Sequence, residues 1–155
     1  MNGRSPADGV WLEDLPLGET IECGTFRLTE REIVDFAATY DPQPFHLSAE
    51  AGRQSIFGGL VASSTQSLAI SCGLVVRAHA RVRFVCGAAW RDIVLHRPVR
   101  PDTDYAVRAR WTAARASASK PDRGIADIAI AVADGEGPVM TYGIAYFVWR
   151  RPSGR

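Results

Sequence analysis

Asp41 and His46 are the two side chains of this sequence best suited to acid–base chemistry. They lie five residues apart in the stretch Tyr-Asp-Pro-Gln-Pro-Phe-His-Leu, residues 40–47. The prolines between them, Pro42 and Pro44, fix their own φ and push the preceding residue toward extended geometry. The pair is therefore not expected to sit on one helix. We expect a rigid bend that directs a carboxylate and an imidazole at a single water molecule, as a general acid–base pair requires.

A helix is expected immediately before this pair. Thr29 and Glu32 have the spacing of a capping box, in which the hydroxyl accepts from the Glu N–H and the carboxylate reaches back. Apolar residues then recur at helical spacing up to Tyr40. The helix must end at Asp41, because Pro42 follows. The C-terminal end of a helix disfavours a negative charge, so this position favours a pKa suited to catalysis.

A second, buried helix is expected within residues 54–76, which contain no charged residue. The segment is long enough to span a bilayer, but its three glycines, five serines and two glutamines are a poor membrane composition. Gly58 and Gly59 open it, and we expect the helix from about Leu60 to a point between residues 74 and 80. Ser48 is expected to cap a shorter turn before it.

The remaining elements are expected to be strands. One lies near residues 19–28, before the helices, and four follow them at Ala89–Val99, Tyr105–Ala116, Ile125–Ala133 and Val139–Trp149. Apolar and polar residues alternate in the middle two, and short turns between successive strands imply an antiparallel sheet. A long apolar helix against a strongly curved antiparallel sheet predicts an α+β fold.

Length and charge limit the class of protein. A chain of 155 residues suits one domain with a real core, here residues 1–155. Residues 1–50 hold ten acids and three bases, whereas residues 77–123 hold eleven Arg and Lys and four acids. A basic surface can bind nucleic acid or a phosphorylated small molecule. The arginines are spread over several strands with no nucleic-acid motif, so we expect a phosphate-bearing ligand, or none, and no nucleic acid.

The cysteines and the N-terminus indicate a cytoplasmic protein. Cys23, Cys72 and Cys86 have no spacing typical of a metal site, and an odd set of thiols fits a reducing compartment. The first residues lack the apolar run of a signal peptide. We therefore expect no metal site and no association with a membrane.

Two motifs resemble the MaoC-like dehydratase family, which includes the (R)-specific enoyl-CoA hydratases. They are residues 36–47, around the acid–base pair, and Phe57-Gly58-Gly59-Leu60-Val61-Ala62-Ser63. The stretches 95–102 and 121–124 are also similar to members of this family. The family has the hotdog fold, an antiparallel sheet wrapped around a long central helix, and this matches the order of elements above. The resemblance implies hydration of a trans-2-enoyl thioester, or the reverse dehydration.

The resemblance also assigns catalytic roles by position. Asp41 and His46 correspond to the catalytic pair of the family. Gly59, at the expected start of the central helix, corresponds to the residue whose backbone N–H polarises the thioester carbonyl. Ser67 falls where the family has a hydroxyl near the pair. Ser64 is a departure, because it replaces a frequent glycine in the helix.

The implied substrate is an acyl-CoA, so coenzyme A enters as part of the substrate and no separate cofactor is expected. The family's acyl-CoA tunnel lies between two subunits, which implies a homodimer or a higher homo-oligomer, and a small curved sheet has an exposed edge that pairing would cover. Expected contacts with the acyl group are Phe45, Ile56, Leu60 and Ser64. Candidate partners for the phosphates of coenzyme A are Arg97, Arg100, Lys120 and Arg123.

Two alternative functions stay open at this point. A hotdog thioesterase would release free thiol from a saturated acyl-CoA, but no Asp or Glu lies between Gly59 and Val76 on the central helix. A non-catalytic acyl-CoA-binding subunit would not need an acid–base pair. His79 and His96 have no carboxylate at a suitable spacing and are expected to be structural or surface residues.

Overall fold

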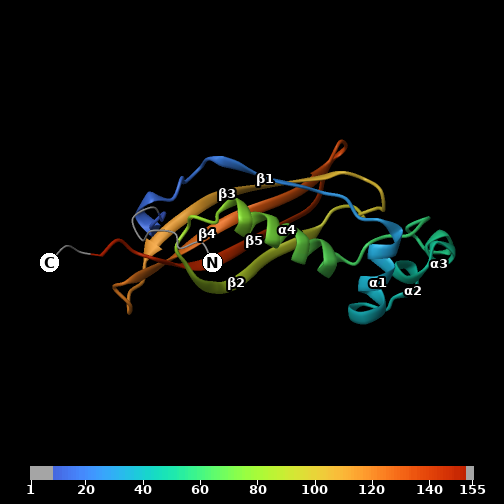
Figure 1. Cartoon of the computed structure of the whole chain (residues 1–155), viewed down its shortest axis with the longest axis horizontal. Coiled ribbons are helices and arrows are strands. Elements are labelled where there is room, and N and C mark those ends of the chain that lie inside the picture. The colour runs from blue at the N-terminus through green and yellow to red at the C-terminus, as the bar shows by residue number, and fades with distance from the viewer. Residues whose placement is uncertain (1–8, 153–155) are drawn as a thin grey trace, which may run out of the picture.

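A five-stranded antiparallel sheet is the largest feature of the fold, and the computed structural model describes residues 9–152 (Figure 1). The order of strands in the sheet is β1-β3-β4-β5-β2, so β1 and β2 are its edges. The strands are β1 (Thr20–Phe26), β2 (Phe84–Leu95), β3 (Tyr105–Ala116), β4 (Arg123–Asp134) and β5 (Gly137–Trp149).

The helices lie between β1 and β2 in the sequence. They are α1 (Glu30–Tyr40), α2 (Pro44–Leu47), α3 (Ala49–Gln54) and α4 (Ser64–Ala78), and a 3-10 turn, η2 (Leu12–Asp14), precedes β1. α4 lies along one face of the sheet, whereas α1, α2 and α3 gather at one end of it (Figure 1). A sheet curved around one long helix is the hotdog fold, as predicted.

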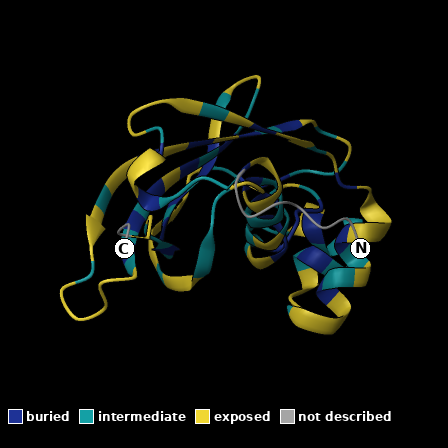
Figure 2. Ribbon diagram, turned by 60° about the vertical axis from the view of Figure 1, so that its left-hand side comes forward, coloured by how far each residue is buried: buried dark blue, intermediate teal, exposed yellow. Residues whose placement is uncertain are grey.

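The interface between the sheet and α4 is the core. In β3 the side chains of Tyr105, Val107, Ala109 and Trp111 are buried, while Arg108, Arg110 and Thr112 on the other face are exposed. This alternation follows from the two-residue period of a strand and confirms the sequence prediction. Figure 2 shows buried residues where the sheet and the helices meet and exposed residues in the loops.

The capping box predicted at the start of α1 is present. Thr29 Oγ1 accepts a hydrogen bond from the Glu32 N–H at 3.2 Å, and Glu32 Oε2 accepts one from the Thr29 N–H at 2.8 Å. Ile33 and Ala37 on the inner face of α1 are buried. The cap therefore fixes where α1 begins, and the following proline fixes where it ends.

Thr29→Ala is expected to lower the free energy of unfolding by about 1 kcal/mol, because one helix N–H loses its acceptor. Urea unfolding followed by circular dichroism measures the change. Thr39→Ala, at an exposed position of the same helix, is the control and should be neutral or slightly stabilising, because alanine favours helix. Equal losses in both variants would contradict a role for the cap.

α4 begins later than predicted. Its N-cap is Ser63, whose Oγ accepts from the Thr65 N–H at 3.2 Å, so the predicted start at Leu60 is wrong. Before it the chain is extended: the Val61 N–H donates to Phe45 O at 3.3 Å, and the Ala62 N–H donates to Val99 O at 2.9 Å. These bonds tie the segment to α2 and to the loop after β2, and they replace helical hydrogen bonds. Within residues 9–152 no helix has the length and apolar character needed to cross a membrane.

Gly52 in α3 packs directly against the backbone of this extended segment. A Cβ placed at Gly52 would lie 2.5 Å from the carbonyl carbon of Gly59 and 2.6 Å from the nitrogen of Leu60. No side chain fits in that space, so only glycine permits this approach.

β2 is an irregular edge strand with an apolar surface. Its pairing with β5 is interrupted by register shifts at three places, and Asp92 at one of them has a φ of 47°. Trp90, Ile93, Val94 and Leu95 are between 44% and 58% exposed. The strand begins and ends earlier than the predicted range of 89–99. It stops before Pro98, which has no N–H for the ladder.

Candidate active site

The bend between α1 and α2 positions the acid–base pair. Asp41 is the C-cap of α1, Gln43 is extended with φ −78° and ψ 139°, and Pro44 is the first residue of α2. His46 follows within α2, a single helical turn that the sequence did not predict. The two prolines thus produce the expected change of direction, and the two side chains come from consecutive elements.

Asp41 and His46 face each other. Asp41 Oδ2 lies 3.4 Å from His46 Nε2. His46 Nδ1 lies 2.7 Å from the carbonyl oxygen of Val61. A carbonyl only accepts, so we assign the proton to Nδ1, and in the neutral ring Nε2 is then a free acceptor directed at Asp41. The His46 side chain is 7% exposed and that of Asp41 is 23% exposed, so the pair is enclosed but reachable.

Two donors hold the carboxylate of Asp41 in its ionised form. Ser63 Oγ donates to Oδ2 at 2.6 Å, and Gln43 Nε2 donates to Oδ1 at 2.9 Å. Ser63 has one hydroxyl hydrogen and gives it to Asp41, so the 2.7 Å contact between Ser63 and Thr65 has Thr65 Oγ1 as its donor. These bonds form a directed chain of hydroxyls that ends on the carboxylate.

The pKa of Asp41 is lowered from its ordinary value, first by the Ser63 hydrogen bond and then by the Gln43 hydrogen bond. Burial opposes this shift, and a positive charge on His46, present only when the ring is protonated, adds to it. The C-terminal end of α1 was expected to disfavour the charge of Asp41. The hydrogen bonds from Ser63 and Gln43 outweigh that effect, which corrects the expectation. Because the folded pKa is depressed, the stability that Asp41 contributes is present above the ordinary pKa of 3.8 and is lost as pH falls through the folded pKa.

Ser63→Ala is expected to raise the pKa of Asp41, because the largest cause of its depression is removed. The acid limb of the pH–rate profile should then move to higher pH, and carbon NMR titration of the Asp41 carboxyl should show the same shift. Ser64→Ala, which leaves the bonds to Asp41 in place, is the control. An unmoved acid limb in a folded Ser63→Ala protein would contradict this cause. The variant also loses an N-cap, worth about 1 kcal/mol, so its folding is checked first.

The pair opens into a cavity of about 340 Å³. The walls come from the bend, the N-terminal turn of α4, the segment before it, the end of β2 with its following loop, and the start of β5. The lining residues are Asp41, Gln43, Phe45, His46, Phe57, Val61, Ala62, Ser64, Ser67, Leu95, His96, Arg97, Pro98, Val99, Val139 and Met140. Most are apolar, and the acid–base pair is the main polar feature of one wall.

The N-terminus of α4 meets this cavity beside the pair. Ser64 is the first residue of the helix and lines the cavity. A backbone N–H at this position has no acceptor in a preceding helical turn, and the helix dipole places partial positive charge there. Among residues 9–152, no group of three or more His, Cys, Asp or Glu side chains is arranged to hold a metal ion. The arrangement suits proton transfer next to a developing negative charge.

Comparison with known proteins identifies the family. The MaoC like domain family matches residues 16–132. The chain belongs to this family. It is also 34% identical to a crystallised MaoC-like dehydratase from Rhodospirillum rubrum, with a TM-score of 0.85 over 94% of this chain and 100% of that one.

Two further relatives are more distant. The R-hydratase PhaJ1 of Pseudomonas aeruginosa is 20% identical, with a TM-score of 0.71 over 93% of this chain and 88% of that one. The uncharacterized protein YdeM of Bacillus subtilis is 27% identical over 94 residues, which are 60% of this chain and 67% of that protein. The chain is therefore a MaoC-like domain with a hotdog fold.

Several predicted site residues of this MaoC-like protein do lie together. Asp41, His46, Phe45, Ser64 and Ser67 all line the cavity. The Phe45 ring packs edge-on against the imidazole of His46, with the ring centroids 4.6 Å apart, and so restricts its rotation. Ser67 is buried, and its Oγ donates to Ser63 O at 3.4 Å, a weak contact with the N-cap rather than with the carboxylate.

Gly59, Leu60 and Ile56 are placed outside the cavity, which corrects their predicted roles. Gly59 and Leu60 line a separate hollow next to Arg53. Ile56 is 96% exposed, and its neighbour Phe57 lines the cavity instead. The cause is the late start of α4: the position at the head of the central helix belongs to Ser64 and not to Gly59.

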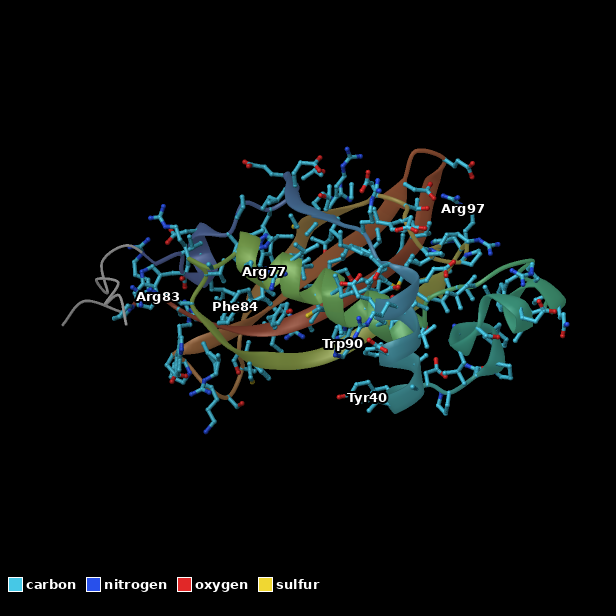
Figure 3. The ribbon with its side chains drawn as sticks, turned by 45° about the vertical axis from the view of Figure 1, so that its right-hand side comes forward. Tyr40, Arg77, Arg83, Phe84, Trp90 and Arg97 are labelled. Atoms are coloured by element: carbon cyan, nitrogen blue, oxygen red, sulfur yellow. The ribbon has the colours of Figure 1, made fainter. Side chains whose placement is uncertain are left out.

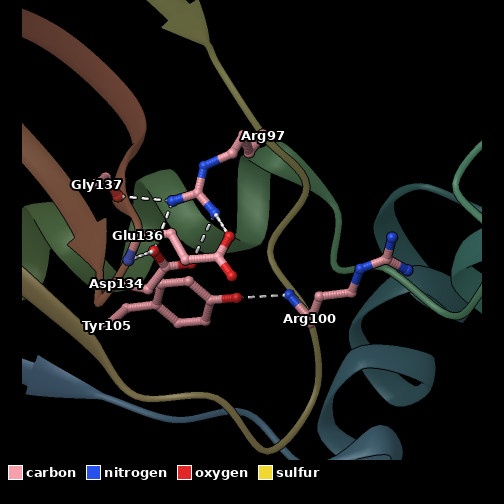
Figure 4. Close-up of polar contacts among 6 residues, drawn as sticks. All are labelled: Arg97, Arg100, Tyr105, Asp134, Glu136 and Gly137. Atoms are coloured by element: carbon pink, nitrogen blue, oxygen red, sulfur yellow. Dashed lines mark hydrogen bonds and ion pairs between the residues drawn. The ribbon is translucent and has the colours of Figure 1, made fainter.

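Arg97 lines the cavity, but its charge is used elsewhere. Its guanidinium donates to Asp134 Oδ1 at 2.5 Å, to Glu136 Oε2 at 3.0 Å and to Gly137 O at 2.8 Å (Figure 4). The hydrogen bond and charge of Asp134 raise the pKa of Arg97 further. Arg97 therefore fastens the turn between β4 and β5 to the cavity wall, and a phosphate would have to compete with two carboxylates for it.

The other proposed phosphate partners are not at the cavity. Arg100 donates to the carbonyl of Phe57, and Figure 4 shows its side chain directed away from Arg97. Arg123 binds Asp122 at 2.9 Å and pairs in the sheet with Trp149, beside the β2 residue Phe84. Figure 3 shows Phe84 and Arg97 on opposite halves of the molecule. Lys120 lies in the turn before Arg123, at the same far end.

Among the residues of the site that were missed from the sequence are three with polar side chains: Ser63, Gln43 and His96. Ser63 had a usable signal, because serine is a preferred N-cap and precedes an uncharged helical run. His96 lines the cavity, and its Nε2 lies 2.8 Å from Thr141 Oγ1. No sequence spacing indicates that partner, because it lies on β5.

Proposed function

We propose that this MaoC-like protein adds water across the double bond of a trans-2-enoyl-CoA, or removes it from the corresponding 3-hydroxyacyl-CoA. The observation that supports this is the pair Asp41 and His46, 3.4 Å apart in a mostly apolar cavity that also meets the N-terminus of α4. A substrate in this cavity would lie next to a proton acceptor, the acid–base pair, and next to a group that stabilises negative charge, the N-terminus of α4. The names of relatives, a MaoC-like dehydratase and an R-hydratase, agree with this chemistry.

The proton acceptor in the hydration direction is the pair, with Asp41 ionised. A water molecule donates to Asp41 and to the free acceptor Nε2 of His46. As its oxygen bonds to C3, one proton passes to the pair, and the π electrons move through C2 onto the thioester oxygen as an enolate. A proton then returns from the pair to C2, and the carbonyl re-forms. Positioned acid–base groups of this kind are worth about 10²–10⁴-fold in rate.

The enolate oxygen needs a donor, and we assign this role to the backbone N–H of Ser64. This group stands at the first position of α4, where a helix stabilises an anion. The neighbouring Thr65 N–H is already bound to Ser63 Oγ. Ser63 thereby serves both halves of the reaction, because the same hydroxyl caps the helix and holds Asp41.

The proposal is tested by incubating the purified protein with crotonyl-CoA and following the absorbance of the conjugated thioester. A loss of absorbance without release of free thiol is expected. Release of thiol from saturated butyryl-CoA would instead indicate a thioesterase, which the absence of any Asp or Glu in α4 does not favour. Binding of acyl-CoA with both substrates left intact would indicate a non-catalytic subunit.

We also propose that the protein is a homodimer paired through β2. This edge carries Trp90 and three further large apolar residues in the open, and unpaired strand edges invite a second chain. Leu95, at the end of β2, also lines the cavity, so a second copy on this edge would lie beside the substrate.

Ile93→Lys is expected to convert the dimer to a monomer, because a lysine on an edge strand opposes pairing. Light scattering after gel filtration measures the mass. Leu17→Lys is the control, since Leu17 is 50% exposed and lies outside β2. A dimer that persists in Ile93→Lys, or a wild type that is monomeric, would contradict pairing through β2.

A further inference from the structure

Two buried hydroxyls meet between α4 and β5, next to residues that line the cavity. Ser67 of α4 and Met140 of β5 both line it. One turn further along α4 is Ser71, and the next inward-facing residue of β5 is Tyr142; neither lines the cavity. Ser71 Oγ and the Tyr142 hydroxyl lie 2.8 Å apart. The phenol therefore reaches from the sheet to the helix and closes the space between them.

The direction of this hydrogen bond is fixed. Ser71 Oγ donates its one hydrogen to Leu68 O at 3.2 Å, so the Tyr142 hydroxyl must be the donor in its contact with Ser71. Both groups are almost fully buried, and burial raises the pKa of Tyr142 so that the phenol stays protonated. A buried, satisfied hydrogen bond of this kind holds the ring in one position.

Other aromatic side chains pack around the Tyr142 ring. The Trp90 ring lies 5.5 Å from that of Tyr142 on the side of the edge strand. Further along β5, Tyr146 OH lies 3.8 Å from Cys72 Sγ, and the centroids of the Tyr146 and Phe84 rings are 4.7 Å apart. Beyond Tyr142, the side of β5 that faces α4 therefore carries a further aromatic side chain.

We propose that Tyr142, held by Ser71, is the end wall of the acyl site and restricts the protein to short-chain acyl thioesters. This rests on the proposed function, since it places the thioester carbonyl at the Ser64 N–H. From Ser64 to Ser71 the helix rises by about 10 Å. Van der Waals contact with the phenol takes up about 3.5 Å of this, so about 7 Å is left for the acyl chain, which is shorter than an extended eight-carbon chain. A longer chain would have to displace a buried hydrogen-bonded ring.

The test compares kcat/KM for crotonyl-CoA and trans-2-octenoyl-CoA in the wild type, Tyr142→Leu and Tyr146→Leu. A methylene that does not fit a pocket costs about 10-fold or more, so the wild type should favour crotonyl-CoA by at least about 10-fold. Tyr142→Leu should remove most of that preference. Tyr146→Leu removes a similar buried ring from the same strand and should keep it. Tyr142→Phe retains the ring and should also keep most of it.

Binding separates a failure of this inference from a failure of the proposed function. Calorimetry with butyryl-CoA and octanoyl-CoA needs no turnover, and the same preference and the same response to Tyr142→Leu are expected. If no hydration is detected but the binding preference is intact, the proposed hydratase function is rejected and the role of Tyr142 as the end wall is retained. Equal binding or turnover of short and long chains by the wild type would overturn the end wall, as would an unchanged preference in folded Tyr142→Leu.

Discussion

Asp41→Asn is expected to lower kcat for hydration of crotonyl-CoA by about 10²–10⁴-fold, because an amide cannot take the proton of the attacking water. The substitution keeps the size and planarity of the side chain. Its oxygen can still accept from Ser63, which now donates at 2.6 Å. The fold and the binding of acyl-CoA should therefore be nearly unchanged, and the loss should appear in kcat rather than in KM.

The matched control for this variant is Asp35→Asn. Asp35 lies on α1, the helix that Asp41 caps, but it is exposed and forms a surface ion pair with Arg31 at 3.4 Å. Its activity should equal that of the wild type. If Asp41 and His46 act as a unit, adding His46→Gln to Asp41→Asn should cost little more than either change alone. Wild-type kcat in folded Asp41→Asn would reject the acid–base assignment.

Ser64→Pro is expected to lower kcat by roughly 10²–10³-fold, the usual cost of losing one oxyanion donor. The substitution removes the backbone N–H of the first residue of α4 and little else. Proline is favoured at this position, since its φ fits a helix and the missing N–H has no helical acceptor. The preceding Ser63 has φ −59° and ψ 138°, which is the extended geometry that a following proline requires.

Ser64→Ala is the control, because it removes the side chain and keeps the N–H. It should retain most of the activity, and the two variants should melt at similar temperatures. Loss of activity in Ser64→Ala to the same extent would move the important group from the backbone to the hydroxyl. Full activity in folded Ser64→Pro would show that another donor stabilises the enolate.

The local signals of the sequence were sufficient for most of the fold. The Thr29 capping box, the proline stop after Asp41 and the alternation in β3 are each decided by neighbouring residues, and all three are confirmed. The ends of β2 and the start of α4 were misjudged. Both depend on partners distant in sequence, such as the Val61 N–H bond to Phe45 and the His96 N–H bond to Val139.

The site was predictable only in part for the same reason. Asp41 and His46 share one short motif, so their chemistry could be recognised together. The Ser63 hydroxyl that depresses the pKa of Asp41 comes from 22 residues away, and its role depends on where α4 begins. Arg97 was expected to be free to bind a phosphate. It binds Asp134 and Glu136 instead, which are distant from it in the sequence. Charge counting along a chain does not reveal such pairs.

The backbone contact between Gly52 and Gly59 links stability to catalysis in this protein. Val61 lies two residues beyond Gly59, and its carbonyl determines which nitrogen of His46 carries the proton. A methyl group at position 52 would press on that segment at 2.5 Å. The imidazole would then lose the acceptor that orients it. Replacing a helical glycine with alanine is a common route to thermostability. At Gly52 of α3 this change is expected to disturb the geometry of proton transfer.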